Sequence, residues 1–94
     1  METKLASAMV ISEQDSVATA TRNIKAGEKV TVGSGGEEYE LLVKDDIKFL
    51  HKFALKNIKK DEKVLKYGWV IGKATRDISQ GEHVHTHNLQ SLRG

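Results

Sequence analysis

The sequence contains no cysteine and no proline among its 94 residues. Without cysteine, a disulfide framework, a thiolate zinc site and a thiol nucleophile are all excluded. The longest uninterrupted apolar run, residues 8–11, is far shorter than the about 20 residues of a membrane-spanning helix or the about 7–15 of a signal-peptide core. We therefore expect a cytoplasmic protein with no membrane partner.

An excess of charge of one sign is also missing. Fifteen Lys and Arg against thirteen Asp and Glu leave a net charge of +2, and the two signs alternate in stretches such as residues 59–63. Nucleic-acid-binding domains gather basic residues on one face, so we expect no nucleic-acid partner. At this length, with 38% hydrophobic residues, the chain makes one domain with a modest core. Little room remains for a complete catalytic apparatus.

An internal repeat is the clearest organising feature. Residues 20–30, 54–64 and 74–84 align without gaps on the pattern Ala, any residue, a basic residue, Asn or Asp, Ile, two variable residues, Gly or Asp, Glu, any residue, Val. The copies are unevenly spaced, which excludes a solenoid of constant period. Each copy predicts a strand, a turn capped by the Asn or Asp side chain, and a second strand. Gly27 or Gly81 supplies a positive φ in the turn.

The density of turns predicts a mainly β fold in a single domain spanning residues 1–94. Residues 30–32 and 39–43 read as strands around the glycine-rich turn 33–36. Residues 1–14 are expected to form an N-terminal strand or arm, and residues 89–94 a C-terminal tail.

One segment has a competing interpretation. Ile47, Leu50, Ala54 and Ile58 have helical spacing behind Asp45 and Asp46, whereas the repeat assigns residues 54–58 to a strand and a turn. We favour the repeat over the helix within residues 47–58, because its aligned positions are more numerous.

Three of the four histidines, His83, His85 and His87, occupy alternate positions near the C-terminus. On a strand, they would form one row able to ligate a metal ion, or to bind an anionic substrate while one acts as a general base. His83 replaces Lys29 and Lys63 of the other copies, which favours a solvent-facing role for it.

We expect function at His85 and His87, where the third copy departs from the repeat. A metal usually takes a third protein ligand, and only Glu82 lies nearby in sequence. Asn88 either orients these side chains or ends the strand. His51 and Lys52 form a second candidate, able to meet a carboxylate, although such a pair is also common on plain surfaces.

Four ordered motifs, at residues 51–55, 66–68, 71–75 and 81–88, together resemble the small subunit, or N-terminal domain, of the altronate dehydratase family. That family includes altronate and galactarate dehydratases and the sulfolactate sulfo-lyases. Leu50 and Asp61 stand where family members commonly have glycine, and residues 33–48 match poorly. The resemblance runs from about Asp15 to Leu89 and is carried by residues 51–55, 66–68, 71–75 and 81–88.

The resemblance implies a small β-clip fold of the SAF type and a lyase. The reaction would be loss of water, as in altronate to 2-dehydro-3-deoxygluconate. A proton α to a carboxylate is only weakly acidic, so a base and a cation or fixed donors are needed. The family places its larger catalytic part in a separate domain or subunit, so this chain would supply one wall of the site.

On this basis His85 and His87 are expected to be catalytic and to hold a divalent metal such as iron or manganese. His51, Lys52 and Asn88 are expected at the substrate. Two alternatives stay open: the alpha subunit of (2R)-sulfolactate sulfo-lyase, which expels sulfite instead of water, and a SAF module that binds a carbohydrate or protein without catalysis.

Overall fold

In the computed structural model, residues 8–10, 15–34, 37–66 and 68–91 are described. This part of the chain contains no helix, and hence none that could cross a membrane. The mainly β class is confirmed. The nine strands of the described residues are β1 (Ala8–Val10), β2 (Val17–Ala20), β3 (Lys29–Ser34), β4 (Glu37–Leu42), β5 (Lys52–Ala54), β6 (Lys63–Lys66), β7 (Trp69–Ala74), β8 (His83–Val84) and β9 (Leu89–Ser91).

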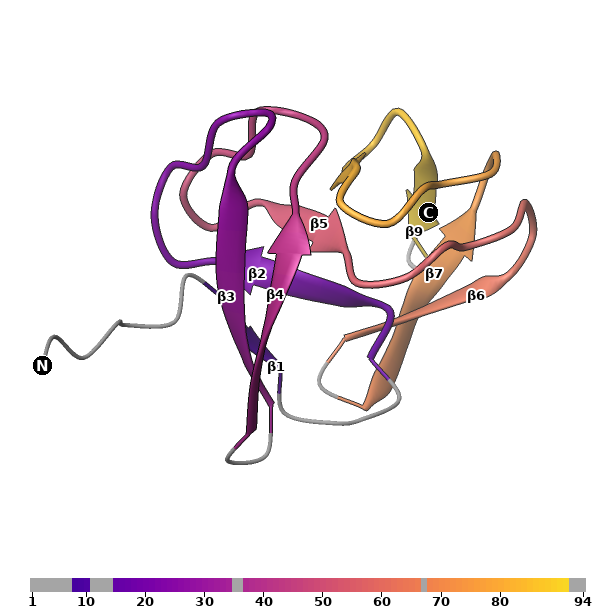
Figure 1. Ribbon diagram of the computed structural model, residues 1–94. Coiled ribbons are helices and arrows are strands. Elements are labelled where there is room, and N and C mark those ends of the chain that lie inside the picture. Colours follow the sequence, from indigo (N-terminus) through magenta and orange to yellow (C-terminus); the bar gives the residue numbers. More distant parts are fainter. Residues whose placement is uncertain (1–7, 11–14, 35–36, 67, 92–94) are drawn as a thin grey trace, which may run out of the picture.

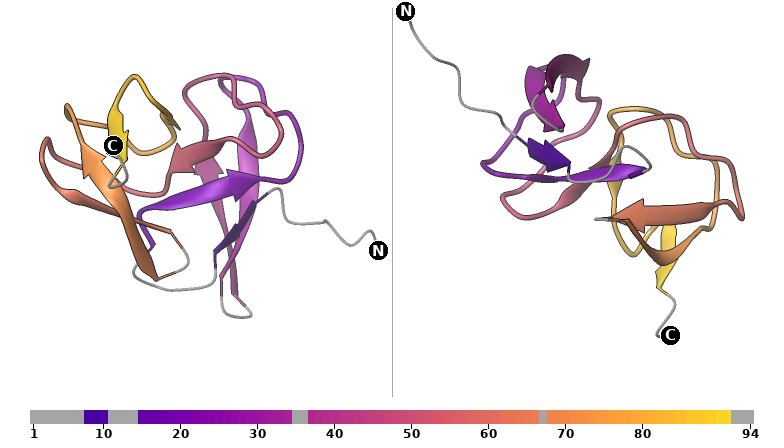
Figure 2. Two further views of the ribbon diagram at one scale, coloured as in Figure 1. Left: turned by 180° about the vertical axis from the view of Figure 1, so that it is seen from behind. Right: turned by 90° about the horizontal axis from the view of Figure 1, so that it is seen from below.

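The strands form a six-stranded sheet in the order β4-β3-β1-β2-β5-β8 and a three-stranded sheet in the order β6-β7-β9. Strands β1 and β3 run parallel, and the other pairs within these sheets are antiparallel. Figure 1 shows β3 and β4 on one side of the molecule and β6, β7 and β9 on the other, with β2 and β5 between them. The views from behind and from below show the same two lobes (Figure 2).

The ends of the chain differ in part from expectation. Residues 89–91, expected in a C-terminal tail, form β9 and pair with β7. Within residues 1–14, β1 provides an N-terminal strand, and the rest of that segment lies outside the described residues. The strands expected around the glycine-rich turn are confirmed as β3 and β4, which pair up to Ser34 and Glu37. Residues 35–36 of that turn lie outside the described part.

The repeat occurs four times instead of three. Residues 43–53 form a further copy, in which Asp46 and Ile47 occupy the Asn/Asp and Ile positions. The eighth residue of every copy has a positive φ: 86° at Gly27, 71° at Leu50, 72° at Asp61 and 86° at Gly81. The helix considered within residues 47–58 is therefore wrong, because this stretch closes one strand-turn unit and opens the next.

The copies associate in pairs through their turns. In the first pair, Ile24 and Ile47 exchange both backbone hydrogen bonds at 2.8 Å. The Asn23 Oδ1 accepts the N–H of Phe49 at 2.8 Å, and the Asp46 Oδ1 accepts the N–H of Ala26 at 2.9 Å. Each Asn or Asp thus caps the turn of the partner copy. The sequence had suggested that it would cap its own turn.

The third and fourth copies repeat this arrangement. Ile58 and Ile78 exchange backbone hydrogen bonds, and Asn57 and Asp77 each accept a backbone N–H from the opposite turn at 2.9 Å. Each side-chain bond of this kind contributes about 1 kcal/mol net. The same four contacts therefore close both halves of the molecule.

Each pair of copies encloses its own hydrophobic core. Strands β2 and β5 contribute to both, because alternate residues of a strand face opposite sides. Ala18, Ala20 and Phe53 pack into the first core, and Val17 and Ala54 into the second. The first core also holds Ile24, Val30, Val32, Leu41, Val43, Ile47 and Leu55, and the second holds Ile58, Val64, Ala74, Ile78 and Val84.

The positive φ of Leu50 and Asp61 yields a stability prediction. A left-handed conformation costs an ordinary L-residue about 1–2 kcal/mol, and less for Asp. Leu50→Gly should therefore raise the free energy of unfolding by about 1 kcal/mol, since most of its side chain is already exposed, and Asp61→Gly by about half as much. Urea denaturation of each variant beside the wild type measures both, and a Leu50→Gly variant less stable than wild type would contradict the assignment.

Candidate functional site

The three C-terminal histidines do not lie on one strand. Strand β8 ends at Val84, and residues 85–88 form a turn that leads into β9. The backbone N–H groups of Asn88 and Leu89 both bond to the His85 carbonyl, at 3.1 and 2.9 Å. The predicted row of histidines is therefore wrong, because the chain folds back directly after Val84.

The turn nevertheless gathers histidines, and it adds one from elsewhere. His51 Nδ1 lies 3.0 Å from His83 Nε2, so one ring donates a hydrogen bond to the other. His51, His83 and His85 can each offer a ligand nitrogen such that all three lie within 4.8 Å of one another. We call these three residues the histidine cluster. Their rings are stacked, with centroids 4.9 to 5.6 Å apart.

His87 lies at the margin of the cluster. Its ring centroid is 5.5 Å from that of His83, in a tilted arrangement. The sequence paired His85 with His87 as metal ligands, whereas the structure groups His85 with His83 and His51. His83, which the repeat assigned to a solvent-facing role, is half-buried at the centre of all four rings.

The repeat explains how distant histidines meet. His51 takes the ninth position of the second copy, where the other three copies carry Glu. His83 takes the tenth position of the fourth copy, where the others carry Lys. Strand β5 pairs with β8, and Phe53 lies opposite His83 in this pair. The pairing joins the end of the second copy to the end of the fourth copy, and so connects the two halves of the molecule.

Two polar side chains fix the backbone of this turn. The Asp45 Oδ2 accepts the N–H of His83, and the Asn88 Oδ1 accepts the N–H of His85, both at 2.9 Å. The Asn88 Nδ2 donates to the His83 carbonyl at 2.8 Å. Asn88 is fully buried, and its two hydrogen bonds hold the backbone of His83 and His85 in place.

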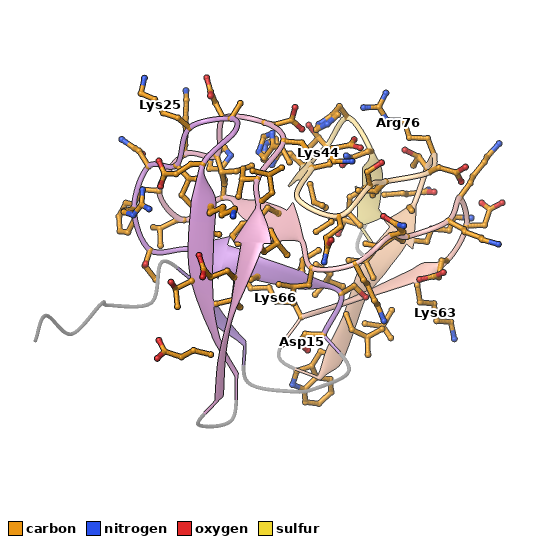
Figure 3. The ribbon with its side chains drawn as sticks, viewed as in Figure 1. Asp15, Lys25, Lys44, Lys63, Lys66 and Arg76 are labelled. Carbon is orange, nitrogen blue, oxygen red and sulfur yellow. The ribbon has the colours of Figure 1, made fainter. Side chains whose placement is uncertain are left out.

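A pocket of about 460 Å³ opens beside the cluster. Figure 3 shows Lys44 and Arg76 at the same upper edge of the molecule. Arg76 forms an ion pair with Glu82 at 3.6 Å, and the Asp45 carboxylate is engaged by the His83 amide. The pocket is lined by Lys44, Asp45, Arg76, Glu82, His83 and His87. Sequence reasoning missed Lys44 and Asp45, because a tertiary contact places them there: the Lys44 N–H bonds to the Gly81 carbonyl of the fourth copy at 2.8 Å.

Lys52 belongs to a different environment. Burial, followed by the charge of Lys66 on β6, lowers the pKa of its ammonium group. It lies on β5 between Thr19 of β2 and Val84 of β8, and it belongs neither to the histidine cluster nor to the lining of the pocket. The structure therefore brings His51 to the cluster but does not bring Lys52 with it.

The cluster has the donor set of a metal site. Two nitrogens 3.0 Å apart fit neighbouring positions around one ion at metal–nitrogen distances of about 2.0–2.1 Å, and His85 can supply the third ligand. Imidazole donors suit iron, zinc, copper or nickel, whereas manganese favours oxygen donors.

Comparison with known proteins identifies relatives of this chain. The family model of the altronate/galactarate dehydratase SAF domain matches residues 6–92. Altronate dehydratase of Bacillus subtilis (strain 168) is 46% identical over 81 residues, which are 86% of this chain and 16% of that protein. The chain thus spans about a sixth of that relative.

Shorter relatives are matched over most of their length. The (2R)-sulfolactate sulfo-lyase subunit alpha of Chromohalobacter salexigens is 39% identical over 72 residues, covering 74% of this chain and 77% of the relative. The protein of the same name from Paracoccus pantotrophus is 44% identical over 62 residues, covering 66% of this chain and 92% of the relative.

The environment of His83 predicts how stability depends on pH. Burial first, and then the charges of His51, His87 and His85, lower the pKa of His83, and Asp45 only partly opposes them. The unfolded chain takes up this proton near pH 6.5, while the folded chain does so only at lower pH. In the presence of a chelator, the free energy of unfolding should therefore fall as the pH drops below about 6.5. Urea denaturation from pH 7.5 to 5 tests this, and the fall should be smaller in His83→Gln; an equal fall would contradict the prediction.

Proposed function

The chain belongs to the SAF-domain family of altronate and galactarate dehydratases, and we propose that it serves as the small part of a lyase of that family. In this proposal, it supplies one wall of an active site that a larger catalytic chain or domain completes. The observation that carries the proposal is the histidine cluster beside an open pocket. Functional groups gathered on an exposed surface are enclosed only when a second surface covers them.

The burial of the histidines supports this one-sided arrangement. His51 and His83 are half-buried, whereas His85 and His87 are exposed. Exclusion of water strengthens electrostatic interactions in an active site, and an exposed cluster cannot achieve this alone. We infer that the chain has little activity by itself.

The cluster is proposed to hold a divalent cation through His51, His83 and His85. When bound, the cation would supply positive charge that stabilises the substrate as the carbon next to its carboxylate loses a proton. The buried Asn88 and the carboxylate of Asp45 fix the backbone that carries two of the three rings. Such fixed supporting groups hold ligand side chains ready for the ion.

The pocket residues suggest roles at the substrate. Lys44 and Arg76 carry positive charge at the pocket and are proposed to orient a carboxylate, the role that the sequence had assigned to Lys52. His87 lines the same pocket outside the histidine cluster and is proposed to accept the α proton. As the carbon–carbon double bond forms, the β-hydroxyl leaves as water with the proton that His87 has accepted. The enol product then rearranges to a 2-oxo acid.

The proposed substrate is a sugar acid of the altronate type. A second candidate is sulfolactate, which loses sulfite in place of water. It is favoured by the 44% identity to a sulfo-lyase subunit alpha over 92% of that subunit. Both substrates are hydroxylated carboxylic acids, so the same cation and the same pocket charges suit either of them.

Metal titration tests the ligand set. His51→Ala, His83→Ala and His85→Ala should each weaken binding of Fe²⁺ or Zn²⁺ at least about tenfold, since loss of even a supporting residue costs about 10–100-fold in affinity. His87→Ala serves as the control and should change the affinity less than about twofold. Anaerobic titration calorimetry measures all four variants. Binding that depends on His87 and not on His51 would replace the proposed cluster with the pair expected from the sequence.

Turnover tests the shared site. The wild-type chain, combined with the large catalytic chain of the same enzyme, should act on altronate or on sulfolactate, and neither chain should do so alone. His85→Ala and His87→Ala should each lower kcat at least about 100-fold, because each removes a ligand or a proton acceptor.

The exposed Lys59→Ala serves as the control for this assay and should leave kcat unchanged. Full turnover by the small chain alone would overturn the shared site. Full turnover by the pair carrying both histidine substitutions would favour a binding module without a catalytic part.

A further inference from the structure

The turn of the second copy exposes two large apolar side chains next to the histidine cluster. Phe49 is 55% exposed and Leu50 is 62% exposed, and His51 follows them directly. The backbone N–H of His51 bonds to the Lys48 carbonyl at 2.9 Å and so closes this turn. We call Phe49 and Leu50 the apolar tip. Because His51 directly follows the apolar tip, a partner that contacts the tip also influences the position of His51.

The turn itself does not require apolar residues at these positions. The equivalent residues of the other copies are Ala26-Gly27, Lys60-Asp61 and Gln80-Gly81. All four turns nevertheless share the positive φ and the same reciprocal hydrogen bonds. The large apolar residues are therefore a property of the second copy alone and not of the fold.

Leu50 also brings an unfavourable backbone conformation. Its φ of 71° disfavours any residue with a Cβ, and its exposed side chain returns little packing within the chain. Backbone conformations of this kind gather where a protein binds something, and exposed apolar surface marks interaction sites. The two features coincide at a single residue beside His51.

Basic residues flank the apolar tip. Lys48 precedes it in the same turn, and Lys25 lies in the paired turn of the first copy. The ion pairs formed by the described residues involve Arg22, Lys73 and Arg76, and neither of these two lysines. A matching surface would therefore present an apolar recess with an acidic rim.

We propose that the apolar tip is the contact by which the chain docks onto the catalytic part of the enzyme. The occupant is an apolar recess with an acidic rim on that part, and the contact sets the position of His51 in the completed site. The identity of the occupant rests on the proposed function. The match of this chain to 16% of the altronate dehydratase shows that a large remaining portion accompanies the same domain in that relative.

Charge argues against a second copy of the chain as the occupant. A two-fold contact places the same surface patch on both sides of the interface. Lys25 and Lys48 of both copies would then lie in one interface, and like charges gathered at an interface oppose association. An acidic partner surface has no such cost.

Leu50→Gly is the decisive variant, because it should change stability and docking in opposite directions. It removes the apolar side chain and relieves the positive φ, so the isolated chain should become more stable while its affinity for the catalytic chain falls at least about tenfold. Asp61→Gly is the matched control. It relieves the equivalent position of the third copy and should leave the affinity within about twofold of wild type.

Calorimetric titration of each purified variant into the large catalytic chain measures the affinity, with Phe49→Ser as a second test of the tip. Unchanged affinity in both tip variants would overturn the proposal, as would a wild-type chain that associates only with itself. Docking that depends on Leu50 without any turnover would support the contact and refute the proposed function. The two ideas can therefore fail separately.

Discussion

The structure depends on a reciprocal exchange between neighbouring turns, in which each turn lends a side-chain oxygen to a backbone amide of the other. An eleven-residue strand-turn unit has few partners of its own for its polar backbone groups. Pairing supplies two side-chain caps and two backbone bonds at once, as Asn23 and Asp46 show. It also brings the two Ile residues of each pair into one core. The same bonds therefore satisfy the turns and organise the hydrophobic packing.

Because these few residues hold the turns together, other positions of the unit can carry different side chains in different copies. The Asn or Asp, the Ile and the residue of positive φ carry the structure, while the seventh, ninth and tenth positions vary among copies. His51 and His83 occupy two of these variable positions, and the pairing of β5 with β8 brings them together. Candidate functional groups have thus been added to the fold without altering the contacts that hold it.

Much of the fold could be predicted from the sequence because its determinants are local. The Asn or Asp, the Ile and the Gly or Asp shared by three copies are sufficient to predict the β class and the turns. The copy at residues 43–53 is hidden in the sequence because it departs from the pattern at five positions: Val43, Asp45, Leu50, His51 and Phe53. The helical spacing of Ile47 and Leu50 added to the difficulty, although Leu50 is in fact the turn residue of positive φ.

The candidate site could be predicted only in part, because three of its features depend on burial or on tertiary contacts. The concentration of histidines at residues 83–87 was visible, but the fold-back after Val84 depends on the buried Asn88. The third ring, His51, lies 32 residues from His83 in sequence, and only the pairing of β5 with β8 brings it near. Lys44 and Asp45 join the pocket through the contact of the second copy with the fourth, where the Lys44 N–H bonds to the Gly81 carbonyl at 2.8 Å.

The contiguity of the two paired units has a consequence for the order of folding. The first pair is built from residues 20–53 and the second from residues 54–84, so each half can form its turn contacts from one stretch of chain. Contacts of short sequence separation form early, and longer ones follow. The histidine cluster draws His51 from the first half, His83 from the second and His85 from the turn that follows the second, so it is assembled only when the halves dock. A cation held there would act as a cross-link between two folding units and would slow their separation.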